Sequence, residues 1–205
     1  MTMTASEVNR IKQAMPADGV LPVFHQRWSP RAFADREVAQ EDLRRVFEAA
    51  RWAPSSSNEQ PWRYVVGTRG TETHGKIFES LVGFNQMWAG KAPVLMLGVA
   101  KARFSHNNSA NLYAVHDLGA ASAYVVLQAA ALGLTAHQMA GFDREKARAL
   151  LGIPEGYEFG SVIALGYQGE PETLLNEELI KRETEPRERK ALGEFVFSAW
   201  GKALF

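Results

Sequence analysis

A long run of small and apolar residues in the middle of the chain is the feature that most constrains its fold. Residues 111–133 contain no proline, and alanine occupies six positions between residues 120 and 131. Because alanine has the highest helix propensity, this segment predicts one helix of about 35 Å. Its apolar part, 118–134, includes Ser122 and Gln128 and is shorter than the roughly 20 residues needed to cross a bilayer. We therefore expect a buried helix that packs closely against another helix, and no membrane-spanning segment.

Composition limits both the domain count and the partners. The 205 residues, 46% hydrophobic and 22% charged, predict a single globular domain. Lys plus Arg (23) equals Asp plus Glu (23), so no overall charge favours nucleic acid or an anionic membrane surface. The chain has no cysteine, which excludes disulfides, thiolate metal ligands and cysteine nucleophiles and fits a cytoplasmic protein. The polar residues near the start do not form a secretory signal.

Helical and strand patterns alternate along the rest of the chain. Apolar spacing predicts helices at 4–15, 41–52, 71–82, 111–133 and 143–151, and strands at 63–66, 93–100, 135–139 and 159–167. An entry loop is expected at 22–30, and a charged tail, helical at first, from residue 173.

Several common chemistries lack their sequence patterns. Neither a phosphate-binding P-loop nor a GxGxxG fingerprint is present, which excludes the usual nucleotide-binding folds. The five histidines never fall at HxxxH spacing, so we expect no metal site. The serines at 55–57 lack a GxSxG motif, which disfavours a hydrolase.

Separated segments carry groups suited to an anion. Arg27, Ser29 and Arg31 place two guanidinium groups and a hydroxyl within five residues, a composition suited to phosphate. Arg187 and Arg189 form a second basic pair. Residues 54–58 offer hydroxyls and a carboxamide that suit a polar heterocycle. Taken alone, the Arg27–Arg31 segment and the Arg187–Arg189 pair fit a solvated surface better, and residues 54–58 fit a loop that ends a helix equally well.

Taken in order, these segments resemble the nitroreductase family of flavin-dependent oxidoreductases. The resemblance rests on seven stretches: RWSPRAF (27–33), WAPSSSNEQPWRYVV (52–66), APVLMLGVA (92–100), DLGAASAYVVLQAAALGL (117–134), QMAG (138–141), FGSVIALGY (159–167) and RERK (187–190). They span nearly the whole chain. The resemblance implies an α+β fold with a central, mostly antiparallel sheet flanked by helices. It also implies an intertwined homodimer in which residues 172–205 of the single domain wrap the partner.

The same resemblance implies a site for FMN at the dimer interface. The residues that it assigns to FMN are Arg27, Trp28, Ser29, Arg31, Pro54, Ser55, Ser56, Asn58, Gln138, Met139, Ala140, Gly141, Arg187 and Arg189. Arg31 is expected near N1 and O2 of the ring, and the tail arginines at the phosphate. The amides of Ala140 and Gly141 are expected near N5 and O4, and residues 54–58 come from the partner. A phosphate of nearly two negative charges gives a physical reason for basic groups in both segments.

The implied activity is a ping-pong hydride transfer from NADH or NADPH to a small electrophile such as a nitroaromatic or a quinone. Such chemistry needs no acidic or basic side chain, because the flavin carries it. Aromatic candidates for the substrate pocket are Phe84, Trp88, Phe104 and Tyr113. The alternatives are a reductive dehalogenase or flavin-fragmenting enzyme, whose lid would lie within 72–106, and a flavin-binding dimer without turnover.

Overall fold

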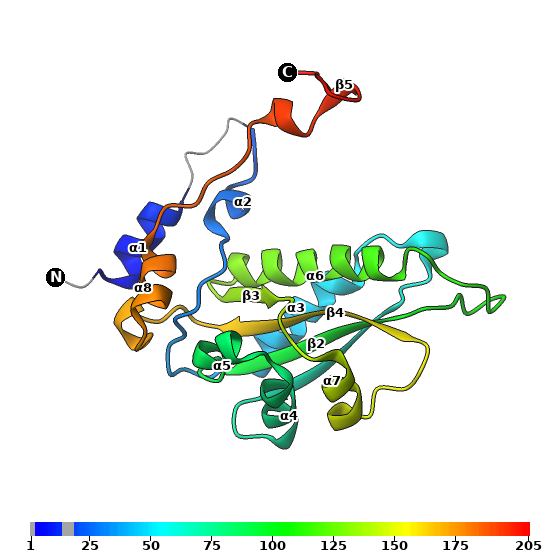
Figure 1. Ribbon diagram of the computed structural model, residues 1–205, viewed down its shortest axis with the longest axis horizontal. Coiled ribbons are helices and arrows are strands. Elements are labelled where there is room, and N and C mark those ends of the chain that lie inside the picture. Colours follow the sequence, from blue (N-terminus) through cyan, green and yellow to red (C-terminus); the bar gives the residue numbers. More distant parts are fainter. Residues whose placement is uncertain (1–2, 14–18) are drawn as a thin grey trace.

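A four-stranded antiparallel sheet forms the centre of the molecule (Figure 1). The computed structural model describes residues 3–13 and 19–205. The strands are β1 (Trp62–Thr68), β2 (Val94–Lys101), β3 (Thr135–Met139) and β4 (Tyr157–Gly166). Their order across the sheet is β1-β2-β4-β3, and every neighbouring pair is antiparallel. The expected central antiparallel sheet is thereby confirmed.

Strand β2 is buried on both faces, as its unbroken apolar sequence predicts. Its side chains alternate between two hydrophobic clusters. Leu95 and Leu97 belong to the cluster on the side of α4, α5 and α7. Val94 and Met96 belong to the cluster on the side of α3 and α6. The sheet therefore lies between two layers of helices.

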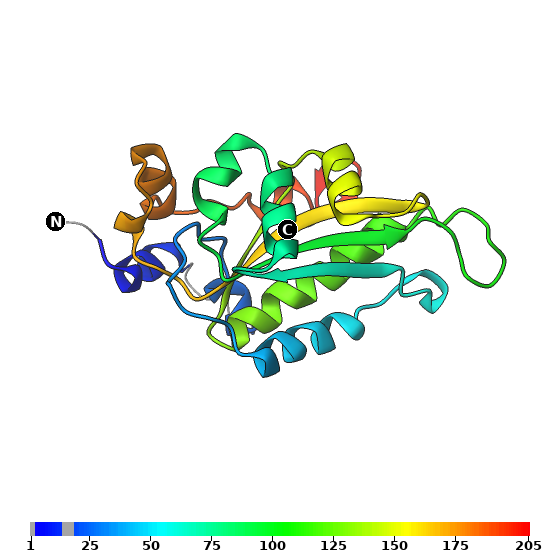
Figure 2. The ribbon, with the colours of Figure 1, turned by 90° about the horizontal axis from the view of Figure 1, so that it is seen from below.

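The two helical layers are visible in Figure 2, with α3 and α6 on one face of the sheet and α4, α5 and α7 on the other. The α-helices are α1 (Ala5–Lys12), α2 (Pro22–Gln26), α3 (Gln40–Arg51), α4 (Glu72–Ser80), α5 (Gly83–Ala89), α6 (Ala114–Ala131), α7 (Arg144–Leu151) and α8 (Glu177–Thr184). Single 3-10 turns occur at η1 (Ser56–Asn58), η2 (Pro171–Thr173) and η3 (Leu192–Glu194). Within the described residues no helix is long and apolar enough to cross a membrane.

The long central helix is present but shorter than 111–133. A turn precedes it, in which Asn111 Oδ1 accepts a hydrogen bond of 3.0 Å from the amide of Tyr113. Such a side-chain bond competes with helix formation, so α6 begins at Ala114. Gly133, with a φ of 73°, lies just beyond its last turn.

Two glycines let the first turns of α6 lie directly on the sheet. A Cβ atom built on Gly160 of β4 would lie 2.6 Å from Leu118 Cδ2, and one on Gly98 of β2 would lie 3.2 Å from Leu118 Cδ1. Side chains at these positions would push the helix outward. The glycines therefore fix the depth at which the start of α6 is seated.

Other boundaries differ from the sequence expectations. The expected loop 22–30 contains α2, which has proline in its first turn, where the missing N–H costs nothing. The expected helix 71–82 ends at Ser80, and α5 follows as a separate helix. The end of the expected first helix, residues 14–15, lies outside the described residues.

The two end regions of the chain lie side by side. Helix α8 packs against α1 at one end of the sheet (Figure 1). The chain then passes α2 and forms a small hairpin of β5 (Phe197–Ala199) and β6 (Lys202–Ala203), away from the central sheet. The tail is therefore helical at first, as its sequence predicts.

Candidate functional site

The Arg27–Arg31 loop is held in place by its backbone. On one side, the carbonyl of Pro30 lies 3.0 Å from Nδ1 of His137 on β3. On the other side, the carboxylate of Glu183 on α8 accepts hydrogen bonds from the amide of Arg31, at 2.9 and 3.1 Å, and from the amide of Ala32, at 3.1 Å. The loop is thus pinned between the sheet and α8.

Six cationic side chains converge at this loop around a pocket of about 220 Å³, called the cationic pocket below. They are Lys12, Arg27, Arg31, Arg182, Arg187 and Arg189, and Trp28 and Ser29 complete the lining. The tail clamps the loop, because Arg187 donates hydrogen bonds to the carbonyls of Arg27 (2.5 Å) and His25. The structure therefore brings together the two basic segments that lie 160 positions apart in the sequence.

The charges in the cationic pocket are only partly compensated. Burial lowers the pKa of Arg31, an effect that Glu183 opposes and Arg182 reinforces. Burial and the neighbouring Arg189 lower the pKa of Arg27. Burial also lowers the pKa of Lys12. Since an anion in the pocket would relieve this crowding of like charges, the arrangement suits a phosphate or a similar oxyanion.

A buried donor in the pocket also lacks a partner. Within the described part of the chain, Nε of Arg31 has no hydrogen-bond acceptor although it is shielded from solvent. Buried polar groups are nearly always paired in folded proteins. This unpaired donor indicates that a ligand acceptor completes the site.

His137 contributes geometry rather than charge. Burial, with a smaller contribution from the neighbouring Arg31, lowers the pKa of His137 to about 4. The neutral ring donates Nδ1–H to the Pro30 carbonyl and packs 4.6 Å from the ring of Trp88. Trp88 is only 1% exposed and also stacks on Phe33, so it is a core residue and the expectation that it lines a substrate pocket is wrong.

The second group of predicted residues, 54–58, lies at η1 and is anchored to α6. The amide of Ser56 donates to the buried carboxylate of Asp117 at 3.0 Å, and Ser55 Oγ accepts from the amide of Gln60 at 3.0 Å. Left-handed backbone conformations occur at three non-glycine residues of this loop: Ser57, Asn58 and Gln60. Such strained conformations cluster at functional sites. The loop is therefore a second candidate for ligand contact.

Within one chain the two groups do not meet. Asp117, which anchors the Ser56 loop, lies in the first turn of α6. Ala130, which lines a pocket together with Arg27, lies in its last turn. A rise of 1.5 Å per residue separates these two points by about 20 Å. Figure 1 shows η1 and α2 at opposite ends of α6.

The 138–141 segment continues from His137 at the end of β3. The carbonyl of Gly141 accepts from the side-chain amide of Asn85 at 2.9 Å, and a Cβ atom on Gly141 would lie 2.8 Å from that nitrogen. A side chain at this position would therefore force the side chains of Asn85 and Val82 to shift. Ala140 is exposed, whereas the side chain of Met139 is buried in the core, so only the backbone of Met139 is free for ligand contact.

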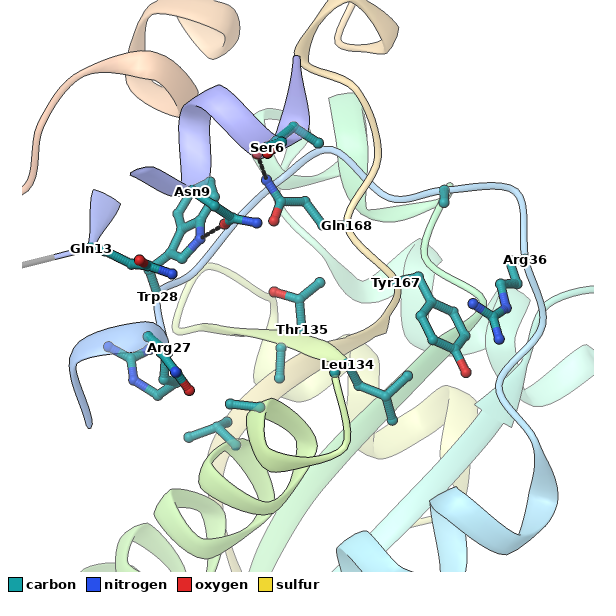
Figure 3. Close-up of a pocket in the computed structure, with 17 residues that line it drawn as sticks. Ser6, Asn9, Gln13, Arg27, Trp28, Arg36, Leu134, Thr135, Tyr167 and Gln168 are labelled. Carbon is teal, nitrogen blue, oxygen red and sulfur yellow. Dashed lines mark hydrogen bonds between the residues drawn. The ribbon is translucent and has the colours of Figure 1, made fainter. Parts of the chain in front are cut away.

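A larger pocket of about 590 Å³ adjoins the cationic pocket and shares Arg27 and Trp28 with it (Figure 3). The indole N–H of Trp28 donates a hydrogen bond of 2.8 Å to Asn9 Oδ1. This bond holds the ring at the boundary of the two pockets, both of which it lines. Arg36 stacks at 3.7 Å over Tyr167 on the other side of the opening. The end of α6 forms the floor, so this hollow lies beside the exposed face of that helix.

Three residues of the site carry no sequence motif: Lys12, Arg182 and Glu183. Lys12 is 6% exposed, and its ammonium donates to the carbonyl of Arg182 at 2.9 Å. Glu183 is completely buried and lies four residues after the buried Leu179 on α8. A charged residue at helical spacing on the apolar face of a short helix was the only available signal.

Comparison with known proteins identifies the chain. The family model described as "Nitroreductase family" matches residues 25–83 and 74–167, more than half of the chain. The chain belongs to the nitroreductase family. It is accordingly an oxidoreductase.

Individual relatives agree with this assignment. An Archaeoglobus fulgidus protein, provisionally named an NADH dehydrogenase/NAD(P)H nitroreductase, is 33% identical over 153 residues, covering 72% of this chain and 84% of that protein. An NADH dehydrogenase of Thermus thermophilus is 30% identical over 176 residues, covering 71% and 84%.

Solved structures support the fold. A crystal structure described as an oxidoreductase containing FMN aligns with a TM-score of 0.84 and 34% identity, covering 91% of this chain and 94% of that one. A nitroreductase family protein from Streptococcus pneumoniae aligns with a TM-score of 0.70, at 21% identity, over 86% of this chain and 98% of that one. The family and the α+β nitroreductase fold expected from the sequence are therefore confirmed. No cluster of potential metal ligands occurs among residues 3–13 and 19–205.

Proposed function

We propose that this chain is an FMN-dependent oxidoreductase that takes electrons from NADH or NADPH and reduces a small electrophile such as a nitroaromatic or a quinone. The observation that carries the proposal is the cationic pocket, in which six basic side chains from four segments surround a space of about 220 Å³. A phosphomonoester fits the charge of this pocket. The pyrimidine edge of a flavin carries acceptors of the kind that Arg31 Nε lacks within the described chain.

The pocket residues would hold and orient the cofactor. In this proposal Arg27, Ser29, Arg187 and Arg189 bind the phosphate by charge-assisted hydrogen bonds. Arg31 faces the pyrimidine edge of the ring, where its guanidinium favours negative charge. Bound FMN supplies hydride transfer, for which no acidic or basic side chain is needed.

The remaining contacts require a second copy of the chain. Because α6 separates the Ser56 loop from the Arg27 loop by about 20 Å, one flavin cannot touch both loops of the same chain. In a homodimer the loop of one copy can meet the cationic pocket of the other. Residues 54–58 of the second copy then cover the ring, while Ala140 and Gly141 of the first approach it through their backbone.

Two exposed surfaces support this homodimer. On α6, Gly119, Ala123 and Leu127 follow one another at four-residue spacing on a face left exposed or half-buried by the rest of the chain. The small residues Gly119 and Ala123 allow a second helix to approach closely at this end of the face. In the tail, Trp200 is 97% exposed and Phe205 is 78% exposed. We propose that these aromatic side chains are buried against the second copy.

The kinetic scheme that we propose is ping-pong, in which the nicotinamide and the oxidised substrate occupy the same position in turn. Binding at one position lets the protein orient both reactants with the same groups. His137, neutral above its pKa of about 4, keeps the Arg31 loop in place without adding charge beside it.

The test is spectroscopic. The purified protein should be yellow, lose its visible absorbance on addition of NADH or NADPH under argon, and recover it on addition of a quinone. FMN-free protein should bind FMN more tightly than riboflavin, because riboflavin lacks the phosphate. A protein that takes up FMN but is not bleached by either nicotinamide would refute the proposed activity. Equal affinity for FMN and riboflavin would refute the proposed phosphate site.

A further inference from the structure

Glu183 is the buried acid of the cationic pocket. It is 0% exposed, and both of its carboxylate oxygens accept hydrogen bonds from the backbone of the Arg27–Arg31 loop and its continuation at Ala32. Isolated buried carboxylates are costly unless they are paired and hydrogen-bonded. The position of this carboxylate therefore reflects a specific arrangement with the loop.

The charges around Glu183 come from three parts of the chain. Arg31 and Lys12 are the cations that act on its carboxylate, from the loop and from α1. Arg182, its neighbour on α8, acts in turn on Arg31. Burial raises the pKa of Glu183, and the two amides and the two cations oppose that effect. Donation from amide N–H groups to both oxygens is the pattern of an ionised carboxylate.

We propose that Glu183 is a positioning residue for the flavin site, which holds the backbone of Arg31 and offsets part of the positive charge at the ring end of the pocket. This inference rests on the proposed function. The positioning of the backbone follows from the hydrogen bonds to the amides, which fix the main chain of Arg31 and so the point from which its side chain extends. The charge role follows from the buried negative charge beside Arg31, which weakens the attraction of that guanidinium for an anionic reduced flavin.

The two roles predict different effects for two substitutions. Glu183→Gln removes the charge but retains an oxygen that can accept from the amides. Its flavin should therefore have a more positive reduction potential than the wild-type flavin, because Arg31 acts without its counter-charge. Glu183→Asp keeps the charge but is one methylene too short to reach both amides. It should bind FMN about tenfold more weakly, since hydrogen bonds to a charged acceptor are lost, and its potential should not rise.

A matched control lies on the same helix. Glu178 pairs with Arg182 at 2.6 Å, but its side chain is 61% exposed. Glu178→Gln makes the same chemical change beside the same pocket in contact with water, where charges are screened. We expect it to leave both the potential and the FMN dissociation constant at their wild-type values.

The experiment measures FMN affinity by fluorescence titration of FMN-free protein at pH 8, and the potential by equilibration with redox dyes. A rise in potential in Glu183→Gln but not in Glu178→Gln, together with weaker FMN binding in Glu183→Asp, supports the inference. An unchanged or lower potential in Glu183→Gln overturns the charge role, and unchanged FMN affinity in Glu183→Asp overturns the positioning role.

Failure of this inference is separable from failure of the proposed function. If wild-type protein binds FMN and is bleached by a nicotinamide while the Glu183 variants match it, only the inference fails. If Glu183→Gln does not fold, Glu183→Asp still decides the positioning role. Glu183→Met then decides the charge role, because it also removes the negative charge beside Arg31 and should raise the potential.

Discussion

Protonation of His137 should destabilise the folded protein below pH 6.5. The pKa of His137 falls from an ordinary value of 6.5 to about 4 in the folded chain. Between these values the unfolded chain binds a proton that the folded chain does not, so the free energy of unfolding decreases as the pH falls. Above pH 6.5 both states are neutral and the effect is absent.

The size of the effect follows from the shift. Each pKa unit corresponds to about 1.4 kcal/mol, so a shift from 6.5 to about 4 gives a loss of about 2.5 kcal/mol at pH 4.5 and a limit of about 3.5 kcal/mol at lower pH. This is a large share of the roughly 5–15 kcal/mol that stabilises a typical domain.

Urea unfolding of FMN-free protein, followed by tryptophan fluorescence at one fixed protein concentration, measures the effect between pH 7.5 and 4.5. Carboxylates also titrate in this range, so the quantity that matters is the difference between wild type and His137→Gln. Glutamine retains a donor for the Pro30 carbonyl but cannot take up the proton. The difference in stability should shift by about 2.5 kcal/mol across the range.

His106→Gln is the matched control, because His106 is exposed. Its stability should follow that of wild type at every pH. If the wild-type and His137→Gln curves stay parallel down to pH 4.5, then His137 does not have the lowered pKa on which this reasoning depends.

Four further outcomes are expected. Arg31→Ala should weaken FMN binding by about tenfold or lower the flavin potential, while circular dichroism shows an unchanged fold. If both the FMN affinity and the potential stay at their wild-type values, the role assigned to Arg31 is excluded. Removal of residues 186–205 should reduce both flavin content and dimer stability, which a truncated dimer with full flavin occupancy would contradict. Asp117→Ala should cost about 1–3 kcal/mol in urea unfolding because it leaves the amide of Ser56 unpaired, whereas an unchanged midpoint would show that the contact is dispensable. Ala123→Glu on the exposed face of α6 should give a monomer in light scattering, and a dimer of wild-type affinity would place the interface elsewhere.

Capping residues and glycines in the sequence mark the ends of some helices without help from the rest of the fold. Asp143 and Gly152 stand at the two ends of the helix that the sequence predicts over 143–151. In the structure Asp143 Oδ1 accepts from the amide of Lys146 at 2.9 Å, and Gly152 adopts a left-handed φ of 64°. These signals act within a few residues and need no tertiary contact. The short helix α2 was missed because five residues are too few to show a helical repeat of apolar side chains.

The same distinction applies to the site. Arg27, Arg31 and Arg187 stand out in the sequence because basic residues are grouped with serine or with one another, and the structure brings them together. Lys12 and Glu183 stand in charged segments that resemble ordinary solvated helices. Their burial results from the packing of α1 against α8, a contact between segments 170 positions apart. The sequence offers only the four-residue spacing of Glu183 from Leu179 as a signal, and it does not encode the contact between α1 and α8 that buries this acid.

The packing of α1 against α8 also bears on how the protein is made. Lys12 emerges early in synthesis, whereas Arg189 emerges after the whole central sheet. A nascent chain can fold its sheet and helices before these basic groups meet. Under the proposed function, loading of the phosphate group is then a late event, because a ribosome-bound intermediate that ends before α8 holds the sheet but lacks Arg182, Arg187 and Arg189.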